Sequence, residues 1–169
     1  WNCSTEQVSA RGLEDPQRTS DDMIWLLIDS SNIGGIERHV ATLAESLRRA
    51  GHNAEVVLYG DHGANPWLQQ LQAADLTVRI LDNSFSGLRG ALKQARPSLL
   101  HTHGYKANIL GRAAARLLAI PVVSTFHSGE TAPFPVSAYF TLDNWTSILA
   151  PRIAVSEPIA AKLPFASTH

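Results

Sequence analysis

Short, continuously apolar runs alternate along this chain with longer segments in which apolar residues recur every three or four positions. The runs have the length of β-strands, and one of them, IWLLID at 24–29, has the continuous apolar character that is typical of a parallel strand buried on both faces. The pattern therefore predicts a series of strands after residue 22. The predicted strands are 24–29, 54–59, 77–81, 98–101, 121–126 and 153–155.

The segments between these runs have the pattern of amphipathic helices. In the first of them Ile36, Val40, Leu43 and Leu47 share one side, and Gly51 follows at the position where glycine often ends a helix. Strands that alternate with helices indicate βαβ units with right-handed crossovers. We therefore expect an α/β domain with a doubly wound, mainly parallel sheet and helices on both faces. The predicted helices are 36–50, 67–74, 86–95, 106–119 and 158–163.

Residues 1–22 differ from the rest because they are polar, aperiodic and rich in turn-forming residues. We interpret this segment as a leader, a tag or a disordered extension outside the fold, with a single domain over 23–169. An N-terminal arm packed on the domain is the alternative.

Composition narrows the function classes. The 169 residues carry a net charge of −1, without the basic excess that is typical of proteins that bind nucleic acid. Cys3 is the only cysteine, so neither a disulfide framework nor a cysteine-based zinc site is expected. No apolar run approaches the roughly 18 residues that span a bilayer, and residues 1–22 lack the apolar core of a secretory signal. We therefore expect a cytoplasmic protein.

Ligands of doubly wound sheets bind outside the carboxyl ends of the strands, and the first of these ends is followed by a glycine pair. Gly34 and Gly35 lead into the first predicted helix, whose free N–H groups favour a phosphate or a carboxylate. The third glycine of a dinucleotide fingerprint is missing, which disfavours a dinucleotide-dependent reductase. A tight turn that needs two flexible residues is the alternative interpretation of the pair.

Histidines follow two further strands. His101 and His103, in HTHGYK, are expected to point the same way and either to hydrogen-bond a polar ligand or to be satisfied structurally. No third histidine or acidic residue lies near them in sequence, which argues against a metal site. His127, in STFHSGE, stands at the rim of the sheet with Ser128, and a neutral imidazole there can donate or accept a hydrogen bond.

A basic stretch lies between residues 84 and 118, where there is no Asp or Glu. It is interpreted either as a solvated helix face or as a surface for an anionic acceptor or for lipid headgroups at the inner face of a membrane. Its basic residues are Arg89, Lys93, Arg96, Lys106, Arg112 and Arg116.

Three motifs in series carry a family resemblance: GGIERHVATLAESLRRAGHNAEVV, LLHTHGYKANILGRAAARLLAIPVVSTFH and IAVSEPIAAKL. In this order they resemble the N-terminal, Rossmann-like domain of family 4 glycosyltransferases of the GT-B fold. The resemblance extends from Met23 to the end of the sequence.

The resemblance implies a retaining transfer of a sugar from a nucleotide-sugar donor to an acceptor, which is a sugar, a lipid-linked molecule or another small molecule. It places Gly34 and Gly35 against the donor's diphosphate or sugar and His127 at the reaction centre as the catalytic candidate. His103, with Gly104, Tyr105 and Ser128, becomes a set of substrate contacts. The resemblance implies no metal or other cofactor.

In the family, a second domain with an E-x7-E motif holds most of the nucleotide, and that motif follows the region matched here. We therefore expect the 169-residue chain to be inactive alone. Two alternatives stay open. The first is a non-catalytic module that binds a sugar or an anion, and the second, less favoured, is a sugar-nucleotide epimerase of the same architecture.

Overall fold

The fold was analysed in a computed structural model that describes residues 22–127 and 136–160. Most of the predicted N-terminal extension, as well as Ser128 and the end of the last predicted helix, lies outside the described residues.

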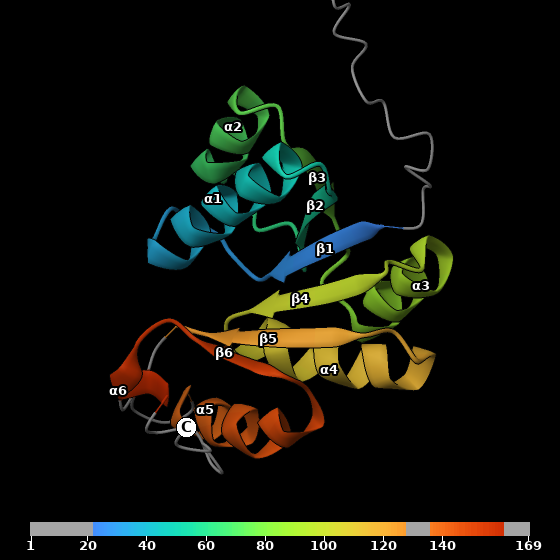
Figure 1. The fold of residues 1–169 in the computed structure, drawn as a ribbon, viewed down its shortest axis with the longest axis vertical. Helices are drawn as coiled ribbons and strands as arrows, with labels where there is room; N and C mark the ends of the chain where they lie inside the picture. The colour runs from blue at the N-terminus through green and yellow to red at the C-terminus, as the bar shows by residue number, and fades with distance from the viewer. Residues whose placement is uncertain (1–21, 128–135, 161–169) are drawn as a thin grey trace, which may run out of the picture.

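The described strands form one sheet of six parallel strands in the order β3-β2-β1-β4-β5-β6 (Figure 1). Strand order therefore reverses between β1 and β4, as it does in doubly wound sheets. This confirms the predicted fold class. The strands are β1 Met23–Ile28, β2 Asn53–Leu58, β3 Thr77–Ile80, β4 Leu99–His103, β5 Val122–Phe126 and β6 Arg152–Ala154.

Helices cover both faces of the sheet, with α1 and α2 on the opposite side from α3 and α4 (Figure 1). The helix α5 packs against α4. The helical elements are α1 Gly35–Arg49, α2 Pro66–Ala73, α3 Phe85–Ala95, α4 Tyr105–Leu118, α5 Val136–Thr146, the short 3-10 helix η1 Ser147–Leu149 and α6 Glu157–Ala160.

Each face of the sheet has its own apolar core, because side chains alternate along a strand. In β1, Leu26 and Ile28 pack with Val40 of α1 on one face, while Trp25 and Leu27 pack with residues of α3 and α4 on the other. A strand that is buried on both faces has no polar side, which explains why the sequence of β1 is continuously apolar.

Strand β4 ends two residues later than predicted, because its end is paired on both sides. His103 lies opposite Ile28 of β1 and opposite Thr125 of β5. The strand therefore persists through the H-x-H motif, and the rings of His101 and His103 lie on the same side with their centroids 4.2 Å apart.

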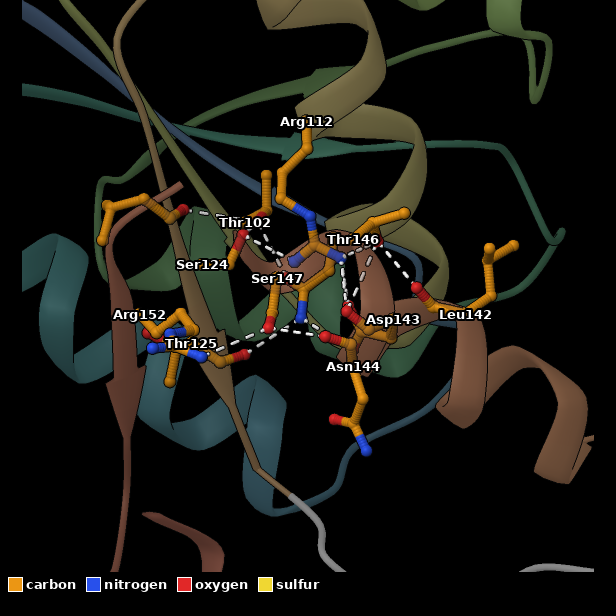
Figure 2. A network of polar contacts seen from close by, with 12 residues as sticks. Thr102, Arg112, Ser124, Thr125, Leu142, Asp143, Asn144, Thr146, Ser147 and Arg152 are labelled. Atoms are coloured by element: carbon orange, nitrogen blue, oxygen red, sulfur yellow. Dashed lines mark hydrogen bonds and ion pairs between the residues drawn. The ribbon is translucent and has the colours of Figure 1, made fainter. Parts of the chain in front are cut away.

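The sequence pattern missed α5 altogether. This helix buries Asp143, which is 3% exposed, and exposes Trp145, which is 74% exposed. Because the buried position carries an acidic residue and a large apolar residue is exposed, the apolar periodicity that marks an amphipathic helix is weak here. The polar contacts that hold α5 come from α4, where Arg112 reaches Asp143 and Thr146 (Figure 2).

The turn between β4 and α4 requires a glycine. Gly104 has φ +84°, a backbone conformation that is strained for other residues. We expect Gly104→Ala to lower the free energy of unfolding of the chain by about 1–2 kcal/mol. Gly90→Ala is the matched control, since Gly90 lies within α3 with open space at its Cβ, and it is expected to raise that free energy by about 0.5–1 kcal/mol. Chemical denaturation measures both, and equal effects of the two changes would contradict the assignment.

Candidate functional site

Three histidines from distant parts of the chain meet at the carboxyl edge of the sheet. His39 comes from α1, His103 is the last residue of β4, and His127 directly follows β5. One ring nitrogen from each lies within 4.8 Å of the others. The closest approach joins His103 Nδ1 and His127 Nε2 at 3.1 Å, and the ring of His39 meets that of His127 edge-on at 5.0 Å. Because α1 follows β1 and β1 lies beside β4, this histidine cluster sits where strand order reverses, the usual ligand position of such sheets.

The three histidines become more exposed with increasing distance from the sheet. His103 is 1% exposed, His127 is half-buried, and His39 is exposed. Burial lowers the pKa of His127 to about 4 and that of His103 well below its ordinary value, and the neighbouring histidines act in the same direction. Both imidazoles are therefore neutral at pH 7, so each has one N–H and one nitrogen lone pair.

The ring of His101 packs against that of His103 and is itself held by a hydrogen bond. Its Nε2 lies 2.7 Å from Thr125 Oγ1, and burial lowers its pKa to about 4. The hydroxyl of a β5 residue thus fixes one ring, whose face lies against the ring of His103. His103 itself has a buried Nε2 without a hydrogen-bond partner among the described residues.

The glycine pair at the start of α1 lies on the same edge. Neither residue has a positive φ, and Gly34 is extended at φ −140°. A tight turn therefore does not explain the pair. A Cβ on Gly35 would meet nothing within 4 Å, whereas one on Gly34 would lie 2.7 Å from Glu37 Oε2. Glu37 is itself held by Ser30 Oγ, which donates to Glu37 Oε1 at 2.6 Å. The open approach to the backbone is thus at Gly35.

A second polar group occupies the edge between β1 and α4. Asp29, just past β1, contacts His62 Nε2 at 2.7 Å and Lys106 Nζ at 2.8 Å. Lys106 also donates to Asn83 Oδ1 at 3.0 Å and stands over the ring of Tyr59. This Asp29 group is partly exposed and offers both hydrogen-bond acceptors and donors at the rim of the sheet.

The other predicted contacts are placed differently. Gly104 is the N-cap of α4, directly after His103. The ring contacts of Tyr105 are with Tyr139 and Phe140 of α5, so Tyr105 joins α4 to α5 rather than entering the histidine cluster. Ser128 lies outside the described residues.

The predicted basic stretch does not form one surface. Arg112 is 1% exposed and pairs with Asp143, and Lys106 pairs with Asp29. Arg96 donates to the backbone carbonyl of Leu118. The interpretation of the six residues as a single docking face is therefore wrong for Arg112. Of the other basic residues, Arg89 and Lys93 lie on α3, whereas the exposed Arg116 lies on α4. Within the described residues, no helix has both the length and the apolar character needed to cross a bilayer.

His39 and Asp29 were missed from the sequence. His39 stands three residues after Ile36 and next to Val40, so helical spacing already puts it at the border of the buried stripe of α1. This border position is the sequence feature that could have identified His39 as a candidate site residue. Asp29 was assigned to the strand itself, but β1 ends at Ile28.

The sequence profile of Glycosyltransferase Family 4 matches residues 33–163, well over half of the chain. The chain belongs to this glycosyltransferase family. The match begins just before the glycine pair and contains His39, His103 and His127, and it confirms the resemblance carried by the three motifs.

Solved structures share the fold. HepE from Anabaena in complex with UDP-glucose matches with a TM-score of 0.69 and 21% identity over 87% of this chain and 41% of its own. A glycosyltransferase from Rickettsia africae matches with a TM-score of 0.60 and 17% identity over 82% of this chain and 38% of its own. UDP-GlcNAc 2-epimerase from Neisseria meningitidis, bound to UDP-GlcNAc, matches with a TM-score of 0.64 and 17% identity over 84% of this chain and 42% of its own.

The family 4 chain thus spans between 38% and 42% of the length of these three structures. No curated protein matches it in sequence.

Proposed function

We propose that this chain is the acceptor-side domain of an enzyme that transfers a sugar, with retention of configuration, from a nucleotide-sugar donor to an acceptor. The family match supports the reaction class. The observation that carries the proposal is the meeting of His103 and His127 beside the start of α1, at the strand-order reversal. Polar groups with defined hydrogen-bonding capacity converge there next to an open stretch of backbone.

The proposed donor is a UDP-sugar. Two structures with the same fold are described as complexes with UDP-glucose and with UDP-GlcNAc. In the proposal the donor's diphosphate or sugar lies against Gly34 and Gly35, where the open space at Gly35 permits close contact with the helix N-terminus. The base and ribose are held by a second, C-terminal domain.

His127 is the proposed catalytic residue. As a neutral imidazole it can donate one hydrogen bond to a sugar hydroxyl while its other nitrogen accepts, and its half-buried position strengthens such a bond. A hydrogen bond aimed at the group that changes in the transition state lowers the barrier without reorganisation. The residues that bind and orient the substrate complete the reaction centre, and the transfer needs no metal.

The acceptor is proposed to lie on the other side of the cluster. His103, Gly104, Tyr105 and Ser128 are its proposed contacts, and the Asp29 group adds a carboxylate and an ammonium that suit sugar hydroxyls. The acceptor is a sugar, a lipid-linked molecule or another small molecule. We further propose a cytoplasmic location, at the inner face of a membrane when the acceptor is lipid-linked.

The test compares two proteins over a panel of nucleotide sugars: the 169-residue chain and the same chain joined to the C-terminal domain of its native reading frame. We expect the longer protein to transfer sugar from at least one donor and the shorter one to show no appreciable turnover, because the second domain's share of the charge stabilisation is missing. Robust turnover by the shorter chain would contradict the division of labour. Interconversion of the donor's sugar without transfer would assign the epimerase alternative. Binding without either reaction would assign the non-catalytic module.

A further inference from the structure

We propose that His39, His103 and His127 form a binding site for a divalent transition metal of the zinc class. The proposal rests on the geometry of the three rings and goes beyond the proposed transfer reaction. Three imidazoles with an open fourth position are a ligand set that zinc accepts, and imidazole also suits copper and nickel.

The spacing of the nitrogens is close to what one ion needs. Zn–N bonds of about 2.0–2.1 Å in a tetrahedral site hold two ligand nitrogens about 3.3 Å apart. His103 Nδ1 and His127 Nε2 are 3.1 Å apart, so this pair already has the separation of two ligands on one ion. One nitrogen from each of the three rings, His39 included, lies within 4.8 Å of the others.

The elements that carry the rings explain how the third ligand completes the set. His103 ends β4 and His127 directly follows β5, and the pairing of these two strands brings the two rings near each other. His39 lies on the surface of α1, where its side chain is exposed and rotation about χ1 and χ2 brings it nearer. The same exposure leaves a direction from which water fills the fourth coordination position.

Metal binding leaves the number of protons on the His103 and His127 rings unchanged. In the present arrangement one of His103 Nδ1 and His127 Nε2 carries the hydrogen that joins them. When both nitrogens ligate the metal, that hydrogen moves to the other nitrogen of its own ring. The ring remains neutral, and the ion takes the place of the shared hydrogen with no net release of a proton. The buried Nε2 of His103 gains no partner in this step unless His103 binds through it.

The ligands of this site are not close together along the chain, so the local sequence around His101 and His103 does not reveal them. His39, His103 and His127 come from three separate elements, and the parallel sheet brings them to one edge. Because His127 is also the proposed sugar contact, a bound ion competes with the donor. The metal is therefore an inhibitor in this proposal rather than a cofactor. Only this competition rests on the proposed function.

The experiment uses the 169-residue chain without an affinity tag. Zn²⁺ affinity is measured by competition with a chromophoric chelator, and Co²⁺ is added separately to detect the visible bands of a tetrahedral ion. The variants are His39→Ala and His127→Ala, whose side chains are exposed and half-buried and whose loss leaves the core intact. His52→Ala, which removes an exposed histidine away from the cluster, is the matched control.

We expect one Zn²⁺ per chain and tetrahedral Co²⁺ bands in the wild type and in His52→Ala. Each of the other two variants is expected to bind Zn²⁺ about 100-fold or more weakly, because changes to residues that only support metal ligands already cost about 10–100-fold. Unchanged affinity in His39→Ala and His127→Ala overturns the proposal, as does a wild-type affinity no greater than that of His39→Ala. Neither result depends on transferase activity, so failure of this proposal is distinguishable from failure of the proposed function.

Discussion

Replacing Arg112 with methionine is expected to lower the free energy of unfolding of this chain by about 3–5 kcal/mol. Arg112 is 1% exposed, and its guanidinium donates to the Asp143 carboxylate, to Thr146 Oγ1 at 2.6 Å and to Ser124 Oγ at 3.1 Å (Figure 2). Methionine preserves much of the side-chain volume, so the loss is one of charge and hydrogen bonds. The substitution leaves the carboxylate of Asp143, a residue that is 3% exposed, without its cationic partner. Among the described side chains, Asn108 then remains as a hydrogen-bond donor to it.

The matched control is Arg48→Met. Arg48 pairs with Asp75 at 3.2 Å, but both side chains are largely exposed, and such pairs contribute about 0–1 kcal/mol. A third variant, Arg112→Met with Asp143→Leu, removes both charges and is expected to regain much of the loss, since a buried pair replaced by apolar groups is often neutral. Urea denaturation of all three measures the differences. If Arg112→Met and Arg48→Met cost the same, the buried network does not stabilise the domain.

Under the proposed transfer reaction, His127→Ala in the chain joined to the C-terminal domain of its reading frame is expected to lower turnover about 10²–10³-fold, with little change in the fold. This magnitude is that of removing one hydrogen-bond donor aimed at a transition state. His127 follows β5, is half-buried and, within the described part of the chain, has His103 as its one hydrogen-bond partner, so its loss leaves the core clusters intact. The measured quantity is kcat with a saturating nucleotide sugar.

Two measurements make the His127 result specific. His52→Ala removes an exposed histidine outside the cluster and is expected to leave kcat unchanged. Unfolding curves of His127→Ala should match those of the wild type, which separates a chemical effect from a folding defect. The assays contain a chelator, so that metal binding at the cluster does not contribute. Near-normal kcat in His127→Ala would refute its catalytic role.

The fold was predictable from the sequence because most of its elements obey a single rule, burial of apolar side chains. The run at β1 is apolar on both faces, that at β2 is interrupted within its buried part only by Glu55, and α1 shows its stripe at Ile36, Val40, Leu43 and Leu47, so pattern alone located them. The element α5 breaks that rule. Its buried residue Asp143 is satisfied by Arg112, 31 positions earlier, and a local pattern carries no information about such a partner.

The candidate site was predictable only in part, for a related reason. His103 and His127 stand at the ends of predicted strands, where the sheet topology expects a ligand, and the family resemblance named both. His39 lies inside a helix whose periodicity explains its neighbours, so only the assembled sheet reveals that its ring faces theirs. The open space at Gly35 likewise depends on which residues pack around it, and the neighbouring sequence does not show this.

The polar attachment of α5 has a consequence for how that helix is positioned. Apolar contacts tolerate sliding, because dispersion has little directionality, whereas hydrogen bonds fix both distance and angle. The bonds from Arg112 of α4 to Asp143 therefore restrict how α5 can shift along α4 more than its ring contacts with Tyr105 do. The chain that leaves the sheet at His127 returns to the described structure at this helix. Arg112 thus fixes the position of α5, and its bond to Ser124 Oγ ties that helix to β5, the strand that ends beside His127.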